Sequence, residues 1–267
     1  MGATERATFV IVATFLLFIA TNMDQTLGLI FVGFALINQV AFSADKRHTF
    51  MIQKNKSLIA SIPLAIMGWG ASILLSWTLV NILGSTGFIQ TAAIGFDQLL
   101  SIISEAQSTL AFSNSYVLNL VSFGVLVPIV ETVLFGGTLF ELGTDLTKTS
   151  IPGSLSGISL TLFLIMIAIA GVFTAFHFTS KGVGNDVALV SVFSFMVVTL
   201  IVILVEKQLA AAVQMHIIAN TIAISLNPTF ALGLSLTTLF LIVLGVLVLL
   251  LANENIRSSA IAAVSSA

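Results

Sequence analysis

Long apolar stretches, separated by short polar segments, make up most of the chain. A helix needs about 20 apolar residues to cross the roughly 30 Å of hydrocarbon in a bilayer. By this rule the sequence predicts an all-α fold, a polytopic transmembrane helix bundle with about eight spans. We expect a single transmembrane domain over residues 1–267. The predicted spans are residues 7–21, 26–43, 58–84, 117–142, 157–178, 186–205, 208–226 and 229–252.

The distribution of Lys and Arg predicts which side of the membrane each loop of this bundle faces. Segment 44–56, between the second and third predicted spans, contains the densest cluster of Lys and Arg in the chain. Short loops rich in Lys and Arg stay on the cytoplasmic side of a membrane. With this segment inside, both termini are cytoplasmic as well, and every Lys and Arg except Lys181 falls on the same side.

The longest predicted connection, residues 85–116, contains one amphipathic stretch. Apolar and polar residues alternate with helical spacing over residues 96–103, a pattern typical of a helix lying at a membrane surface. Two interpretations remain open, a plain extracytoplasmic loop helix and a lid that guides a substrate.

Composition supports a membrane protein and excludes several function classes. The chain is 58% hydrophobic and 7% charged, whereas soluble domains contain about 25% charged residues. The mean hydropathy is +1.15. We therefore expect a multi-pass integral membrane protein, located in the plasma membrane, with the lipid bilayer but no nucleic acid as a partner. The chain contains no cysteine, which excludes disulfides and a thiol nucleophile.

One carboxylate stands out within the apolar stretches. Glu131 lies in the middle of residues 125–137, whereas the other acidic residues fall in or beside polar segments. A charge at the centre of a bilayer costs at least about 2.5 kcal/mol, so such a residue usually faces a partner or a water-filled cavity. No Lys or Arg lies well inside a predicted span to neutralise it. Glu131 is therefore a candidate functional residue.

Two further spans carry paired polar or aromatic residues at one-turn spacing. Phe173 precedes His177, and His216 precedes Asn220, each by one helical turn, which places both members of a pair on the same helix face. A single His or Asn in a membrane bundle usually forms an interhelical hydrogen bond. These two pairs and Glu131 lie on three separate spans, and together they indicate a shared site.

The order of these motifs resembles that of the CAAX protease and bacteriocin-processing (CPBP) family of intramembrane peptidases, also called type II CAAX prenyl endopeptidases. That family carries Glu-Glu-x-x-x-Arg, Phe-x-x-x-His and His-x-x-x-Asn on successive core helices. The second motif is intact at Phe173 and His177, and the third at His216 and Asn220. The resemblance divides the predicted domain into N-terminal spans with the amphipathic loop, a core, and a last span with its tail, at residues 1–116, 117–227 and 228–267.

The first motif departs from the family pattern. Glu131 matches the leading glutamate, but Thr132 stands where the family has its second glutamate and Gly136 where it has its arginine. The surrounding apolar triplet and glycine still resemble the family.

The resemblance implies an endopeptidase that hydrolyses a peptide bond of a peptide or lipidated membrane-associated protein, without a cofactor. It implies that Glu131 and His177 activate water. His216 would help to position that water, and Asn220 would donate to the oxyanion of the tetrahedral intermediate. Phe173 and Thr132 would support the motifs.

Three alternatives remain open. Glu131, His177 and His216 also suit a zinc site with an open position for water. Thr132 and Gly136 favour a catalytically degenerate relative that acts as a membrane scaffold or binds a partner protein. Glutamate and histidine within a bundle also suit the proton relay of a transporter. Against a transporter, one acidic residue lies within a span and no inverted repeat is visible.

Overall fold

A computed structural model describes residues 58–91, 93–108, 115–152, 155–180, 185–207 and 209–226, together with parts of 243–265. Helices account for nearly all of this part of the chain, and it contains no strand. The predicted all-α class is therefore confirmed for the described residues.

Among the described residues, four helices are long and apolar enough to cross a membrane, and they match four predicted spans. These helices are Ile59–Ser85, Tyr116–Thr147, Leu160–Phe178 and Asp186–Glu206. The predicted span 208–226 forms a shorter apolar helix, Ala210–Ser225. Spans 7–21 and 26–43, and most of 229–252, lie outside the described residues. The total of about eight spans and the cytoplasmic termini therefore stay predictions.

The second of these helices is divided into several segments. It consists of α5 (Tyr116–Asn119), η2 (Leu120–Leu126), α6 (Val127–Glu131), η3 (Thr132–Leu139) and α7 (Phe140–Thr147). The remaining elements are η1 (Leu58–Ser61), α3 (Ile62–Ser85), α4 (Phe96–Ser108), η4 (Leu155–Gly157), α8 (Leu160–Ser180), α9 (Asp186–Glu206), α10 (Ala210–Leu226) and α12 (Glu254–Ser265).

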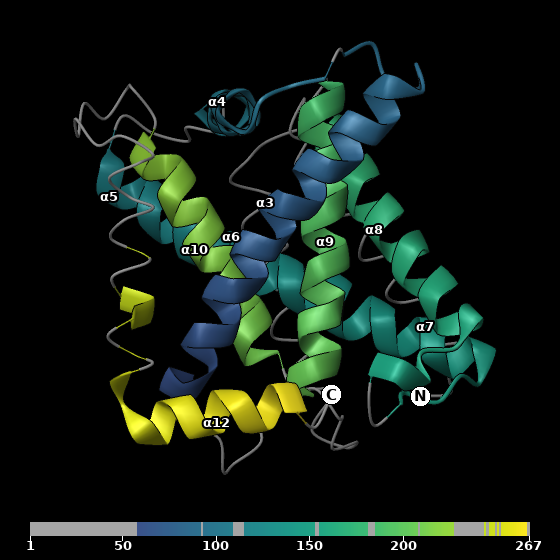
Figure 1. The fold of residues 1–267 in the computed structure, drawn as a ribbon, viewed down its shortest axis with the longest axis vertical. Coiled ribbons are helices and arrows are strands. Elements are labelled where there is room, and N and C mark those ends of the chain that lie inside the picture. The colour runs from purple at the N-terminus through teal and green to yellow at the C-terminus, as the bar shows by residue number, and fades with distance from the viewer. Residues whose placement is uncertain are drawn as a thin grey trace.

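Helix α9 lies at the centre of the bundle. Figure 1 shows α3 crossing in front of α9, with α10 and α8 on opposite sides, while the α5 to α7 helix runs diagonally behind. Gly68 of α3 allows this close packing. A Cβ atom at Gly68 would lie 2.8 Å from both Met215 Sδ of α10 and Val202 Cγ2 of α9. The small residue therefore lets three helices approach closely, as is usual between membrane helices.

Two helices cover opposite ends of this bundle. Helix α4 lies across one end and α12 across the other (Figure 1). The predicted amphipathic helix at 96–103 is confirmed as part of α4. Asn81 of α3 accepts a hydrogen bond from Ile94 N–H at 3.0 Å, and Trp77 Nε1 donates to Ile94 O at 2.9 Å. These contacts hold the chain just before α4 against α3.

A buried glutamate joins the ends of three helices. Glu206, the last residue of α9, is 3% exposed. Its carboxylate accepts hydrogen bonds from the Ser61 hydroxyl and from Ala211 N–H, the latter at 2.7 Å. Ala211 lies in the first turn of α10, where backbone N–H groups have no partner within the helix. Glu206 therefore caps α10 and ties it to the start of α3.

Replacing Glu206 by alanine should destabilise the bundle. Glu206→Ala removes the acceptor from two buried donors, and a lost hydrogen bond to a charged group costs about 1.5–3 kcal/mol. We expect a clear fall in the thermal unfolding temperature of the purified protein in detergent. The matched control is Glu254→Ala, because that side chain is 88% exposed. Equal unfolding temperatures for the two variants would contradict this role.

Candidate active site

The helix that carries Glu131 departs from α-helical geometry on both sides of this residue. Helix α6 lies between two π-helical segments, η2 and η3. Such segments are rare and are often found at functional sites. The helix also continues to Thr147, past the predicted end at residue 142, and ends where Lys148 adopts a left-handed conformation with φ of 53°. Glu131 thus lies at a local irregularity in a long membrane helix.

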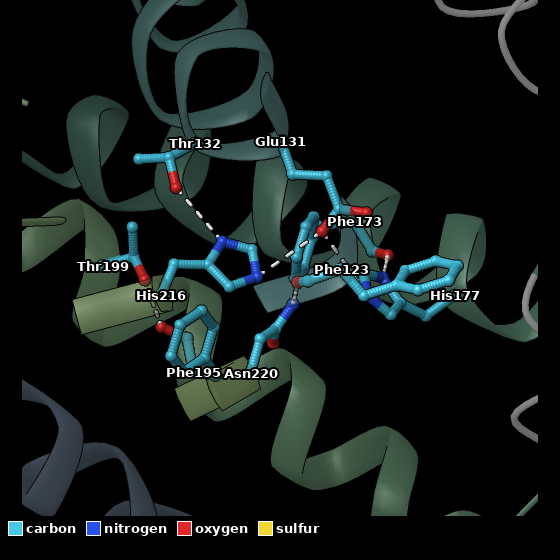
Figure 2. A network of polar contacts seen from close by, with 9 residues as sticks. All are labelled: Phe123, Glu131, Thr132, Phe173, His177, Phe195, Thr199, His216 and Asn220. Atoms are coloured by element: carbon cyan, nitrogen blue, oxygen red, sulfur yellow. Dashed lines mark hydrogen bonds and ion pairs between the residues drawn. The ribbon is translucent and has the colours of Figure 1, made fainter. Parts of the chain in front are cut away.

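The three ionisable residues singled out in the sequence meet at one point. Glu131 Oε2 lies 3.5 Å from His216 Nε2 and 3.8 Å from His177 Nε2. Figure 2 shows both imidazole rings directed toward the Glu131 carboxylate. All three residues are buried, with exposed fractions of 4%, 8% and 5% for Glu131, His177 and His216. His177 lies near the end of α8 and Glu131 in the middle of its span, but the packing of the helices brings them together.

His177 is oriented by the residue with which it was paired in the sequence. Its Nδ1 lies 2.9 Å from the backbone O of Phe173, and the two rings are 4.3 Å apart. A carbonyl oxygen can accept a hydrogen bond but cannot donate one, so Nδ1 carries the hydrogen. In its neutral form His177 therefore presents an unprotonated Nε2 to Glu131.

His216 is oriented by Thr132. The threonine Oγ1 lies 3.1 Å from His216 Nδ1, and this contact joins α10 to the helix of Glu131. The His216 ring also packs against the ring of Phe195 of α9, at 4.9 Å between centroids. Thr132 thus contacts the site directly, at the position where the resemblance places a glutamate.

Asn220 lies beside this group and binds the backbone of the irregular helix. Its Nδ2 donates to Phe123 O at 2.9 Å (Figure 2). In a π-helix, a carbonyl accepts from the N–H five residues later. For Phe123 that residue is Pro128, which has no N–H. Asn220 supplies a donor there, and its amide nitrogen carries a second hydrogen for another acceptor.

Two features of this region were not foreseen from the sequence. A Cβ atom at Gly136 would lie 2.6 Å from Ile203 Cδ1, so α9 fills the space beside this glycine. Glu206 was placed beside a polar segment, yet it is buried at the junction of α9 and α10. Neither fact has a local sequence signal, because both depend on which helices pack together.

Across the described ranges, no group of three His, Cys, Asp or Glu side chains is arranged to hold a metal ion. The zinc alternative for Glu131, His177 and His216 therefore rests on residue types alone.

Comparison with known protein families finds a similarity for this part of the chain. The family model for type II CAAX prenyl endopeptidase Rce1-like proteins matches residues 113–222. This segment covers less than half of the chain, but it contains the whole group around Glu131 and Asn220. Neither the curated proteins nor the solved structures gave a match. Together with the apolar helices, the match indicates an integral membrane protein.

Proposed function

We propose that the chain is an integral-membrane endopeptidase, because residues 113–222 match the family model for type II CAAX prenyl endopeptidase Rce1-like proteins. Its substrate would be a peptide or a lipidated protein held at the membrane. The observation that carries this proposal is the approach of two histidine Nε2 atoms to one Glu131 oxygen, at 3.5 and 3.8 Å. We place the site within the plane of a membrane.

In the proposed reaction, Glu131 and His177 activate a water molecule. The Glu131 carboxylate and the unprotonated Nε2 of His177 both accept hydrogen bonds, and they lie 3.8 Å apart. A water molecule between two such acceptors would donate one hydrogen to each. Loss of one proton to this pair leaves a hydroxide that attacks the carbonyl carbon of the scissile peptide bond. The same proton then passes to the leaving nitrogen, so the products are a carboxylic acid and an amine.

Asn220 would donate to the oxygen of the attacked carbonyl, and His216 would position the water. The second hydrogen of Asn220 Nδ2 is suited to donate to the oxyanion of the tetrahedral intermediate. The bond from Asn220 to Phe123 O fixes the amide, which lowers the cost of orienting it during the reaction. His216 would position the water beside Glu131.

This proposal is tested with purified protein in lipid nanodiscs. A farnesylated peptide with a CAAX-type end, its unprenylated twin and a scrambled farnesylated peptide are incubated with the protein, and the products are identified by mass spectrometry. We expect cleavage within the CAAX-type end, faster for the farnesylated peptide, and unchanged after dialysis against a chelator. If the chelator abolished cleavage and zinc restored it, the zinc alternative would replace the metal-free mechanism.

One observation favours a second candidate, a degenerate relative that holds a membrane partner without cleaving it. Thr132 and Gly136 replace the charged pair of the first family motif, and Ile203 Cδ1 lies 2.6 Å from where a Cβ atom at residue 136 would stand. A protein of this kind would bind the farnesylated peptide in nanodiscs but release it intact.

A further inference from the structure

We propose that Thr132 is a positioning residue that sets the hydrogen-bonding state of His216. In this proposal the threonine hydroxyl donates to Nδ1 of His216 and keeps the ring hydrogen on Nε2, facing Glu131. The catalytic consequence rests on the proposed peptidase function, whereas the protonation pattern itself does not.

The contact is well defined and shielded from water. Thr132 is 2% exposed and His216 is 5% exposed, and Oγ1 lies 3.1 Å from Nδ1. On the opposite side of the ring, Nε2 lies 3.5 Å from Glu131 Oε2. The His216 ring therefore bridges a hydroxyl and a carboxylate (Figure 2).

The Glu131 carboxylate disfavours one of the two neutral forms of His216, and the Thr132 hydroxyl stabilises the other. A carboxylate only accepts hydrogen bonds. An unprotonated Nε2 at 3.5 Å would place a second acceptor directly against it, and such a repulsive contact is costly where the dielectric constant is low. His177 Nε2 is an acceptor at 3.8 Å, where the water of the proposed reaction donates to both groups. A hydrogen on His216 Nε2 instead gives an attractive contact. The other ring nitrogen, Nδ1, must then accept a hydrogen bond, and the Thr132 hydroxyl can donate one.

In this proposal the two neutral histidines carry their hydrogen on opposite ring nitrogens and therefore face Glu131 differently. His177 is held by the Phe173 carbonyl with its hydrogen on Nδ1, so its Nε2 is an acceptor. His216 Nδ1 faces the Thr132 hydroxyl, and with that hydroxyl as the donor its Nε2 carries the hydrogen. This difference assigns proton transfer to His177 and hydrogen-bond donation to His216.

The packing around Gly136 explains why a neutral side chain suits position 132. The space beside Gly136 is filled by Ile203, and a Cβ atom placed there would lie 3.7 Å from Thr132 Cγ2. A carboxylate at position 132 would thus be buried next to apolar groups, without a cation at residue 136 to pair with it. It would also be unable to donate to His216 Nδ1.

Nitrogen NMR on the protein with 15N-labelled histidine tests the proposal without any turnover. The 15N shift of a ring nitrogen reports whether it carries a hydrogen, and His177→Gln and His48→Gln variants assign the signals. We expect His216 to carry its hydrogen on Nε2 and His177 on Nδ1 in the metal-free protein. A hydrogen on Nδ1 of both rings would overturn the proposal.

Three variants separate positioning from a merely structural role. Thr132→Val keeps the shape but removes the hydroxyl, and we expect the His216 signal to change state and kcat to fall about tenfold at unchanged KM. Thr132→Ser should retain both the wild-type signal and kcat within about twofold. The control is Thr199→Val, since the buried Thr199 hydroxyl donates to its own helix at Phe195 O.

The outcomes are distinct. An unchanged His216 signal in Thr132→Val, or a changed one in Thr199→Val alone, would contradict the proposed contact. If wild type shows the predicted states but cleaves no peptide, the hydrogen-bonding proposal stands and the peptidase proposal falls. If Thr132→Val fails to fold, the wild-type and Thr132→Ser spectra still decide the state of His216.

Discussion

Glu131→Gln is expected to lower kcat/KM for peptide hydrolysis at least about 10³-fold while the helix bundle remains folded. Glutamine keeps the size and one carbonyl oxygen of the side chain but cannot take a proton from water. Glu131 is the carboxylate toward which both histidine Nε2 atoms point. Replacing this carboxylate by an amide therefore removes the proton acceptor at the centre of the site without leaving a cavity.

The control for this variant is a carboxylate on the same membrane helix. Glu141→Gln changes a half-buried glutamate in α7, away from the two histidines. We expect its activity to stay within about threefold of wild type. Cleavage by Glu131→Gln at more than about a tenth of the wild-type rate, with an unchanged unfolding temperature, would exclude Glu131 as the base.

His177→Gln is expected to lower kcat by about 10²–10³-fold with little change in KM. The ring presents its unprotonated Nε2 to Glu131 because Nδ1 donates to the Phe173 carbonyl. Glutamine can fill the position but cannot carry a proton between water and the leaving nitrogen. Steady-state kinetics on the farnesylated peptide measures both parameters.

The control for His177 is its aromatic neighbour Phe176. The two ring centroids are 5.7 Å apart, and Phe176 is buried in the hydrophobic core together with Phe173. Phe176→Leu disturbs packing but removes no proton carrier, so we expect a loss of less than about tenfold. Equal losses in the two variants would mean that His177 acts through packing alone.

Much of the fold was predictable because a bilayer imposes simple rules on sequence. Apolar stretches of sufficient length located the helices around residues 58–84, 117–142, 157–178 and 186–205, and each was found. Their ends were set by local chemistry, for example by the Asn185 side chain that accepts hydrogen bonds from the N–H groups of Val187 and Ala188. Backbone donors at a helix start need such a partner.

The residues of the site were predictable, but not all of their contacts. A lone glutamate and two histidines in apolar segments stood out because ionisable groups in a membrane are costly. The contact from Thr132 to His216 joins two helices distant in the sequence, and the bond from Asn220 to Phe123 depends on a π-helical turn. Pro128 indicated an irregular helix, but spacing alone could not predict that the Phe123 carbonyl would accept from Asn220.

The substitutions at Thr132 and Gly136 do not by themselves indicate loss of function. A single change to the charged pair would have left an unpaired charge in a buried position, which is costly. Here a hydroxyl bonds His216 and α9 fills the space beside the glycine, so the site is closely packed without the pair. The peptidase interpretation is therefore compatible with the altered motif.

Hydrolysis in water enriched in 18O tests the central proposal most directly. Wild-type protein and Glu131→Gln are given one equivalent of the farnesylated peptide in nanodiscs, and the products are weighed by mass spectrometry. We predict that the new carboxylate formed by wild type carries one oxygen from the solvent and that Glu131→Gln forms no such product on the same timescale. Intact peptide with both proteins, or the labelled product at equal rates, would contradict hydrolysis by water activated at Glu131.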